Sequence, residues 1–414
     1  MRNVFDQYSQ PENKLTHALM TALNEDKKLL SEFIQKYSNR DNSRNLTLIE
    51  QQLPGQDVTE EEAERKGLPD GWIYDNDNWS LLIESKVSSK LDLDQLERHC
   101  VSANMRGFDN HTVLAIVVTD DFNSNHKWLR VITWSQLYVW LKTYLTKNKS
   151  FWAMQLTRFL EISEIKFTEA KYMTEGTLTE FSGIPFNKEN HYNYLEAKRI
   201  IKLMMNALLK RQVLESELDI DLSKSGRGAI TGSEGVDVWD FLRLKCSTLH
   251  DHTAYPHFTL SLGRDKLYTV ITIPDRVNTA YRKKLFGNGL NSFSEVLKDV
   301  YENLNGLIVK RNLNAIPTIT LLQRHFLSQR SIGKVDGILE FDMRTIFKNE
   351  TSKVKHQPIW LQTVYELLKV KKANTQLSVG LVFNYDNCSE TQSNQILDVV
   401  VETWLGLKPL VQLL

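Results

Sequence analysis

The stretch LPDGWIYDNDNWSLLIESKV, residues 68–87, decides the fold of the first part of the chain. Its middle, YDNDN, consists of residues that favour turns, because their short polar side chains hydrogen-bond to nearby backbone groups. The flanking segments 71–74 and 79–87 are rich in aromatic and aliphatic residues, which favours strands. We therefore predict a β-hairpin whose turn lies at residues 74–78.

Three charged side chains gather at the open end of this predicted hairpin. Side chains alternate between the faces of a strand, so Glu84 and Lys86 share one face. Asp70 lies at the open end of the neighbouring strand, where a short register shift would bring its carboxylate beside Glu84. Two adjacent carboxylates repel each other unless a cation compensates, and Mg²⁺ prefers a few carboxylates with water and phosphate oxygens. The group could support metal-assisted phosphodiester hydrolysis, although a turn aspartate and a surface Glu–Lys pair would give the same letters.

The segments on both sides of the hairpin give this group its context. Apolar residues recur with helical spacing in residues 11–37 and again in residues 91–105. The segments 46–53, 111–119 and 130–133 are short and rich in β-branched or aliphatic residues, as strands are. The predicted order begins with helix, strand, strand, strand, helix and strand.

This order resembles the PD-(D/E)xK nuclease superfamily, which has the restriction-endonuclease-like fold. The resemblance rests on Pro69 and Asp70 before one strand, Glu-x-Lys at residues 84–86 on the next, and Gln95 early in the following helix. It covers roughly residues 5–145, about a third of the chain. It implies an α/β domain with a mixed central sheet flanked by helices, and an active site where the strands diverge.

The resemblance also implies roles for individual residues. Asp70 and Glu84 would be metal ligands, Lys86 the catalytic lysine, and Gln95 a residue that steadies the site. Glu12 matches the glutamate that many members place on the first helix beside the metal. The implied cofactor is Mg²⁺, for which Mn²⁺ can substitute.

Helix capping would also account for the auxiliary residues. Ser9 and Glu12 have the S-x-x-E spacing of a capping box, in which the glutamate bonds to the backbone at the helix start. Asp92 and Gln95 also have capping spacing. His99 lies one turn beyond Gln95 and could reach the same face, but we predict a solvent-facing helix histidine.

Composition is that of an ordinary globular protein. The chain has 414 residues, of which 41% are hydrophobic, enough for two domains with cores of their own. Cys100, Cys246 and Cys388 are too few and too widely spaced to suggest a disulfide framework or a zinc site. The first ten residues are polar and no apolar run reaches the length of a membrane span. We therefore expect a cytoplasmic protein without a membrane function.

Charge alone does not indicate a nucleic-acid partner. The chain has 51 basic and 51 acidic residues, whereas many duplex-binding domains are strongly basic. Residues 1–165 hold 19 basic and 24 acidic side chains, which leaves 32 and 27 for the rest. This distribution fits an acidic catalytic module with a mildly basic companion that handles nucleic acid, and it equally fits an uneven surface.

We predict three parts along the chain: a catalytic domain at 1–165, a connecting segment at 166–190 and a C-terminal α+β domain at 191–414. The connecting segment contains TEGTLTEFSGIPF, residues 174–186, which is rich in Gly, Ser and Thr and lacks helical periodicity. The C-terminal part alternates helix-like and strand-like segments. Its role would be nucleic-acid recognition, regulation or oligomerisation.

One segment of the C-terminal part carries candidate nucleic-acid contacts. QRHFLSQR, residues 323–330, holds Arg324, His325 and Arg330 together with two glutamines. Such side chains can contact phosphates or base edges. A polar loop after a strand would have the same composition.

Together the motif and its context predict a Mg²⁺-dependent endonuclease that hydrolyses phosphodiester bonds in DNA, of the restriction or anti-phage defence type. The alternatives are an RNase or an exonuclease on the same fold, and a non-catalytic nucleic-acid-binding or scaffold protein. The complete set of Asp70, Glu84 and Lys86 argues against the last, since a decayed site would lose a member. A homodimer is expected for duplex cleavage, because each strand needs an active site, and a partner protein of a defence system is the other candidate.

Overall fold

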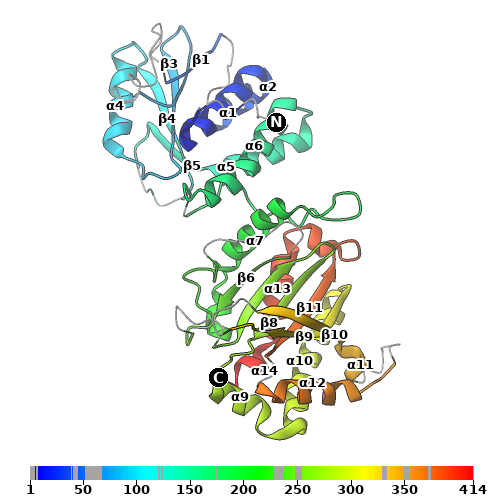
Figure 1. Cartoon of the computed structure of the whole chain (residues 1–414). Helices are drawn as coiled ribbons and strands as arrows, with labels where there is room; N and C mark the ends of the chain where they lie inside the picture. The colour runs from blue at the N-terminus through cyan, green and yellow to red at the C-terminus, as the bar shows by residue number, and fades with distance from the viewer. Residues whose placement is uncertain are drawn as a thin grey trace. The chain divides into compact units, whose positions relative to one another are not determined.

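The computed structural model of the chain forms two compact units, Met1–Glu180 and Phe181–Leu414 (Figure 1). It describes residues 5, 8–38, 40, 45–51, 68–119, 122, 125–173, 175–227, 237–247, 254–328, 333–347, 355–371 and 374–413. The boundary between the units falls inside the predicted connecting segment. Helix α6 (Phe151–Glu169) nevertheless runs past residue 165, where we placed the end of the first domain.

The N-terminal unit is built on a mixed five-stranded sheet of order β1-β2-β3-β4-β5. Its first three strands are antiparallel, whereas β3, β4 and β5 are parallel. The mixed sheet predicted for this part is confirmed. The strands are β1 (Thr47–Glu50), β2 (Gly71–Tyr74), β3 (Trp79–Ser85), β4 (Asn110–Val117) and β5 (Leu129–Thr133).

Helices cover both faces of this sheet (Figure 1). One face packs against α1 (Pro11–Glu25), α2 (Lys27–Ser38), α5 (Trp134–Lys147) and α6, and the other against α4 (Leu93–Asn104). The helical region predicted at residues 11–37 is therefore two helices. They are separated at Asp26, whose carboxylate accepts hydrogen bonds from the first amides of α2.

The two faces of β3 enter different cores, as strand alternation predicts. Leu81 and Ile83 are buried in the core that contains α1, whereas Leu82 lies in the core on the α4 side. Glu84 is two residues beyond Leu82 and shares its face. The carboxylate of Glu84 therefore points toward α4.

Asp75 fixes the turn of the hairpin. Its Oδ1 accepts hydrogen bonds from the backbone amides of Asp77 and Trp79, both at 2.9 Å. The guanidinium of Arg40 lies 2.5 Å from the other carboxylate oxygen and 4.4 Å above the Trp79 ring. Asn78 adopts a positive φ of 83°, which asparagine tolerates well. The turn predicted from YDNDN is confirmed, and it sets the pairing of β2 with β3.

The C-terminal unit contains a six-stranded antiparallel sheet of order β10-β9-β11-β8-β7-β6. An α+β arrangement is confirmed for this unit. Its strands are β6 (Val238–Arg243), β7 (His257–Leu262), β8 (Lys266–Ile273), β9 (Ala315–His325), β10 (Lys334–Asp342) and β11 (Thr375–Asn384).

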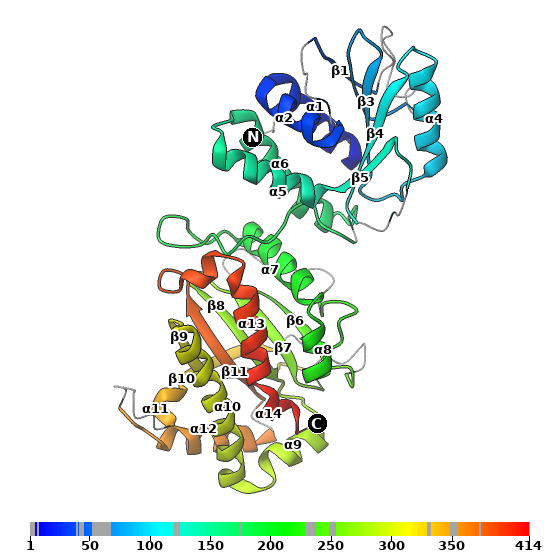
Figure 2. The same cartoon turned by 180° about the vertical axis from the view of Figure 1, so that it is seen from behind.

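Helices pack on one face of this second sheet, where α7, α10 and α13 lie across the strands (Figure 2). The helices of the unit are α7 (Tyr194–Leu208), α8 (Gln212–Leu218), α9 (Thr279–Phe286), α10 (Gly289–Arg311), α11 (Met343–Ile346), α12 (Ile359–Lys369), α13 (Gln395–Gly406) and α14 (Lys408–Val411), with the 3-10 helix η2 (Ser389–Gln392) before α13. Among the described residues, no helix combines the length and the apolar character needed to cross a membrane.

Candidate active site

Strand pairing brings Asp70 and Glu84 together without the register shift that we expected to be needed. In the β2–β3 pair, Trp72 lies opposite Leu82 and Gly71 opposite Ile83. One step further along both strands, Asp70 stands opposite Glu84. The Oδ2 atom of Asp70 accepts a hydrogen bond of 2.7 Å from the backbone amide of Ser85. The hairpin therefore places both carboxylates at its open end.

Three side chains hold the carboxylate of Glu84, which is only 1% exposed. Its Oε1 accepts hydrogen bonds from Lys86 Nζ at 2.5 Å and from Gln95 Nε2 at 2.7 Å. Its Oε2 lies 3.0 Å from His99 Nε2, which donates because a carboxylate can only accept. Both oxygens of Glu84 are thus fixed by donors from the end of β3 and from α4.

Glu12 approaches the same end of β3 from α1. Its Oε1 accepts hydrogen bonds from the backbone amides of Val87 and Ser88, at 3.1 and 3.0 Å, and from the Ser88 hydroxyl at 3.0 Å. The capping box with Ser9 does not form, because α1 begins at Pro11 and Gln10, not Ser9, stands at the N-cap position. Glu12 instead ties the first helix to the loop that follows Lys86.

Helix α4 supplies Gln95 and His99 from adjacent turns of one face. Asp92 caps the helix by accepting from the Asp94 amide, so the side chain of Gln95 is free to reach Glu84. Our prediction of a solvent-facing His99 is wrong: the side chain is fully buried. Its ring can be buried because Glu84, on the strand before α4, provides an acceptor for it. The sequence signal that could have predicted this burial is the spacing Gln-x-x-x-His on a helix that follows a strand with an inward-facing glutamate.

His99 should therefore contribute measurably to folding. In His99→Ala the Oε2 atom of the buried Glu84 loses its donor, and we expect unfolding free energy to fall by about 1–3 kcal/mol. Urea titration followed by circular dichroism measures the change. Arg98→Ala, at the adjacent exposed position on the same helix, is the matched control and should be neutral. Equal stability of the two variants would remove His99 from the support of Glu84.

Burial and neighbouring charges shift the pKa values of Asp70 and Glu84 in opposite directions. Burial raises the pKa of Asp70 well above its ordinary value, and the charges of Glu84 and Glu12 raise it further, against the lowering effects of the Ser85 amide and Lys86. Burial also raises the pKa of Glu84, but the hydrogen bond from His99 and the charge of Lys86 outweigh it, and the pKa is lowered.

Lys86 completes this electrostatic arrangement. Burial lowers the pKa of its amine, but the charges of Glu84, Asp70 and Glu12 outweigh burial and raise it. Lys86 therefore stays a cation beside an ionised Glu84. Asp70 is left as the carboxylate whose ionisation is least compensated by the protein.

The carboxylate oxygens of Asp70 and Glu84 are of the kind that a hard divalent cation binds. Among the described residues, no group of three or more His, Cys, Asp or Glu side chains is arranged to hold a metal ion. Mg²⁺ does not need such a cage, because it keeps several waters and binds through one or two carboxylates plus substrate phosphate. The pKa of Asp70 is raised in part because two other carboxylates lie near it. A bound cation would offset this repulsion and favour the ionised form of Asp70.

Two of the predicted nucleic-acid contacts, Arg324 and His325, lie in the C-terminal unit. Arg324 and His325 belong to the end of β9, not to a loop. Arg324 donates to Gln376 Oε1 at 3.0 Å, and His325 Nδ1 lies 2.5 Å from Asp336 Oδ1. Arg330 lies outside the described residues. Two of the three predicted contacts are thus engaged with neighbours on the same sheet.

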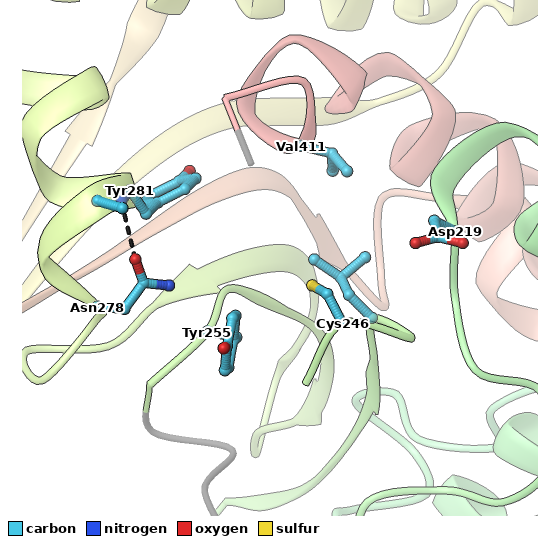
Figure 3. A pocket seen from close by; sticks show the side chains of 8 residues that line it. Asp219, Cys246, Tyr255, Asn278, Tyr281 and Val411 are labelled. Atoms are coloured by element: carbon cyan, nitrogen blue, oxygen red, sulfur yellow. Dashed lines mark hydrogen bonds between the residues drawn. The ribbon is translucent and has the colours of Figure 1, made fainter. Parts of the chain in front are cut away.

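A cavity of about 500 Å³ also lies in the C-terminal unit (Figure 3). Asn278 points toward Tyr281 there and caps its helix, with its Oδ1 accepting from the Tyr281 amide at 2.8 Å. The lining contains one carboxylate and neither lysine nor arginine, which does not suit a polyanion. The lining residues are Asp219, Leu244, Cys246, Tyr255, Asn278, Ala280, Tyr281 and Val411.

Comparison with known proteins does not assign a function. No protein-family model matches the sequence, and no curated protein shows significant similarity to it. The function is therefore inferred from the geometry of the site.

Proposed function

We propose that the chain is a Mg²⁺-dependent nuclease of the PD-(D/E)xK type that hydrolyses phosphodiester bonds in DNA. The observation that carries the proposal is the convergence of Asp70, Glu84 and Lys86 at one end of the β2–β3 hairpin, with Glu84 held by Gln95 from α4. A Glu–Lys pair on an ordinary surface would be solvated and would not need a second carboxylate beside it. The burial of Glu84 and the presence of Asp70 beside it therefore favour a working site.

The side chains of the site divide the chemistry among them. A divalent ion bound at Asp70 and Glu84 would polarise a phosphoryl oxygen and activate water for attack. Lys86 would stabilise the negative charge that grows on the phosphoryl group, or hold the attacking water. Gln95 and His99 keep the Glu84 carboxylate in one orientation, and Glu12 fixes the loop after Lys86.

The buried charges favour a catalytic site over a non-catalytic protein that retains the fold. Taking the carboxylate of Glu84 and the amine of Lys86 out of water is costly, and well-packed apolar residues are often at least as stable in such positions. A protein that needed only the fold would have no reason to keep them. A setting in restriction or anti-phage defence rests on the motif resemblance alone.

The test is cleavage by the purified full chain. Supercoiled plasmid, linear duplex, single-stranded DNA and RNA are incubated with Mg²⁺, with Mn²⁺ or with EDTA, and products are separated on gels. We expect plasmid DNA to be nicked or linearised with either metal and to stay intact in EDTA. Cleavage that is unchanged in EDTA would contradict metal dependence.

The same assay separates the alternatives. Degradation of RNA alone would make the protein an RNase, and shortening of linear DNA with intact plasmid would make it an exonuclease. Retardation of nucleic acid on native gels without cleavage on any substrate would favour a non-catalytic binding protein.

A further inference from the structure

One buried carboxylate fastens the start of the connection between the units to the N-terminal unit. Glu164 of α6 is 6% exposed. Its Oε2 accepts hydrogen bonds from the backbone amides of Leu178 and Thr179, at 3.0 and 2.6 Å, and from the Thr179 hydroxyl at 2.7 Å. The side chain of Leu178 is fully buried in the core that contains α1. The connection therefore belongs to the N-terminal unit as far as Thr179.

Gly176 lets the same segment lie close to the sheet of its own unit. Its φ is +71°, and a Cβ added to it would come within 2.3 Å of the carbonyl oxygen of Val118, directly after β4. Glycine alone combines this backbone conformation with so close an approach, because it has no Cβ. The segment is thus held against the end of β4 as well as against α6.

The next part of the connection is fastened to the C-terminal unit. Phe181, Ile184 and Phe186 are buried in the core of that unit. The Ile184 amide donates to the Thr391 carbonyl at 2.7 Å, and Gln392 Nε2 donates to the Phe186 carbonyl at 3.1 Å. The chain therefore belongs to the C-terminal unit from Phe181 onward.

Glu180 stands between these two fastened segments. Thr179 before it is bonded to Glu164, and Phe181 after it is buried in the other core. Glu180 itself is exposed, and its backbone amide forms no hydrogen bond with any described residue. One extended residue spans at most about 3.6 Å, so the connection has almost no slack. A change of φ and ψ at this residue breaks none of the contacts on either side of it.

We propose that a hinge of one residue, Glu180, joins the two units, and that Glu164 keeps this hinge short. Without the bonds to Glu164, residues 175–179 would lengthen the free connection. A hinge of this length lets the units turn against each other but leaves them little length to separate. The proposal does not depend on the nuclease activity, because its test does not measure cleavage of nucleic acid.

The first test is residue-resolved hydrogen–deuterium exchange of the full chain, read by mass spectrometry. In the unmodified chain the amides of Leu178, Thr179 and Ile184 should exchange slowly, whereas the amide of Glu180 should exchange fast. In Glu164→Ala the amides of Leu178 and Thr179 should exchange about 10- to 100-fold faster, as expected when hydrogen bonds to a charged acceptor are lost. The exchange of the Ile184 amide should not change.

Two variants separate the loss of these bonds from other effects of the substitution. Glu164→Gln keeps an acceptor oxygen at the same reach and should retain most of the protection. Arg158→Ala removes a charged side chain from an exposed position of α6 and should exchange like the unmodified chain.

Digestion with a protease that cuts after glutamate measures the length of the hinge. A protease binds several extended residues at once, so a connection with one free residue should resist cleavage. In Glu164→Ala the released residues should allow cuts after Glu175 and Glu180, at a rate about ten-fold higher than in the unmodified chain. The masses of the fragments identify the cuts.

Three results would overturn the proposal. In the unmodified chain, the Leu178 and Thr179 amides would exchange as fast as the Glu180 amide, or the Glu180 amide would be as protected as that of Ile184. The third result is equal exchange and equal cleavage in Glu164→Ala and Glu164→Gln. The first two results need no variant, so they decide the question even if Glu164→Ala does not fold.

Discussion

Lys86→Ala is expected to lower the rate of metal-dependent DNA cleavage by about 10²- to 10³-fold, the usual effect of removing one group that stabilises transition-state charge. The amine of Lys86 lies 2.5 Å from Glu84 Oε1, inside the cluster of carboxylates, and alanine cannot replace its charge. The variant should still fold, because Gln95 and His99 continue to hold Glu84. Initial rates of plasmid cleavage under single-turnover conditions measure the loss.

A neighbouring lysine provides the control for this variant. Lys90 is exposed and follows the same strand, so Lys90→Ala removes an equal charge without touching the site. It should cleave at the rate of the unmodified chain. If Lys86→Ala and Lys90→Ala are equally active, Lys86 has no catalytic role and the site assignment is wrong.

Asp70→Asn should have two opposite effects: loss of metal-dependent cleavage, and a more stable protein when no metal is present. Burial and the charge of Glu84 hold the pKa of Asp70 well above 3.8, its ordinary value. The folded protein then binds this proton more tightly than the unfolded chain does. Stability is therefore greatest below the ordinary pKa and falls as pH rises through the folded pKa. Asparagine removes that decline because it does not ionise.

Urea unfolding in EDTA, from about pH 4 to about pH 8, measures the pH effect, and repetition with Mg²⁺ measures the cation effect. A ligand present at 100 times its dissociation constant stabilises the fold by about 2.7 kcal/mol. We expect Mg²⁺ to stabilise the unmodified chain and to have little effect on Asp70→Asn. Asp77→Asn, an exposed carboxylate of the hairpin turn, should follow the unmodified chain. Equal stabilisation of all three by Mg²⁺ would place the ion elsewhere.

The central group was predictable because it depends on local rules. A turn made of residues that favour turns fixes how the two strands pair. The alternation of side chains along each strand then decides which of them share a face. These two rules place Glu84 and Lys86 on one face with Asp70 near them, although Asp70 reaches Glu84 without the register shift that we expected. The mixed sheet was predicted because the resemblance to the nuclease superfamily implies it.

The burial of His99 could not be read in the same way, because it depends on contacts between distant segments. A polar side chain on a helix is buried only if the opposing element offers a partner, and Glu84 does so here. We predicted Arg324 and His325 as nucleic-acid contacts, with a polar loop as the alternative, because a polar, exposed strand lacks the alternation that marks a buried one. Their place in β9 is set by pairing with β10, in which Arg324 lies opposite Val335 and His325 opposite Lys334.

The three donors on Glu84 also bear on how such a protein can change over generations. A chain that loses Lys86 keeps two donors on the buried carboxylate, so a single mutation can remove the proposed chemistry and leave a folded protein. A chain that loses His99 first is weakened in its fold while the proposed catalytic group is still complete. Inactive descendants should therefore differ at position 86 more readily than at position 99.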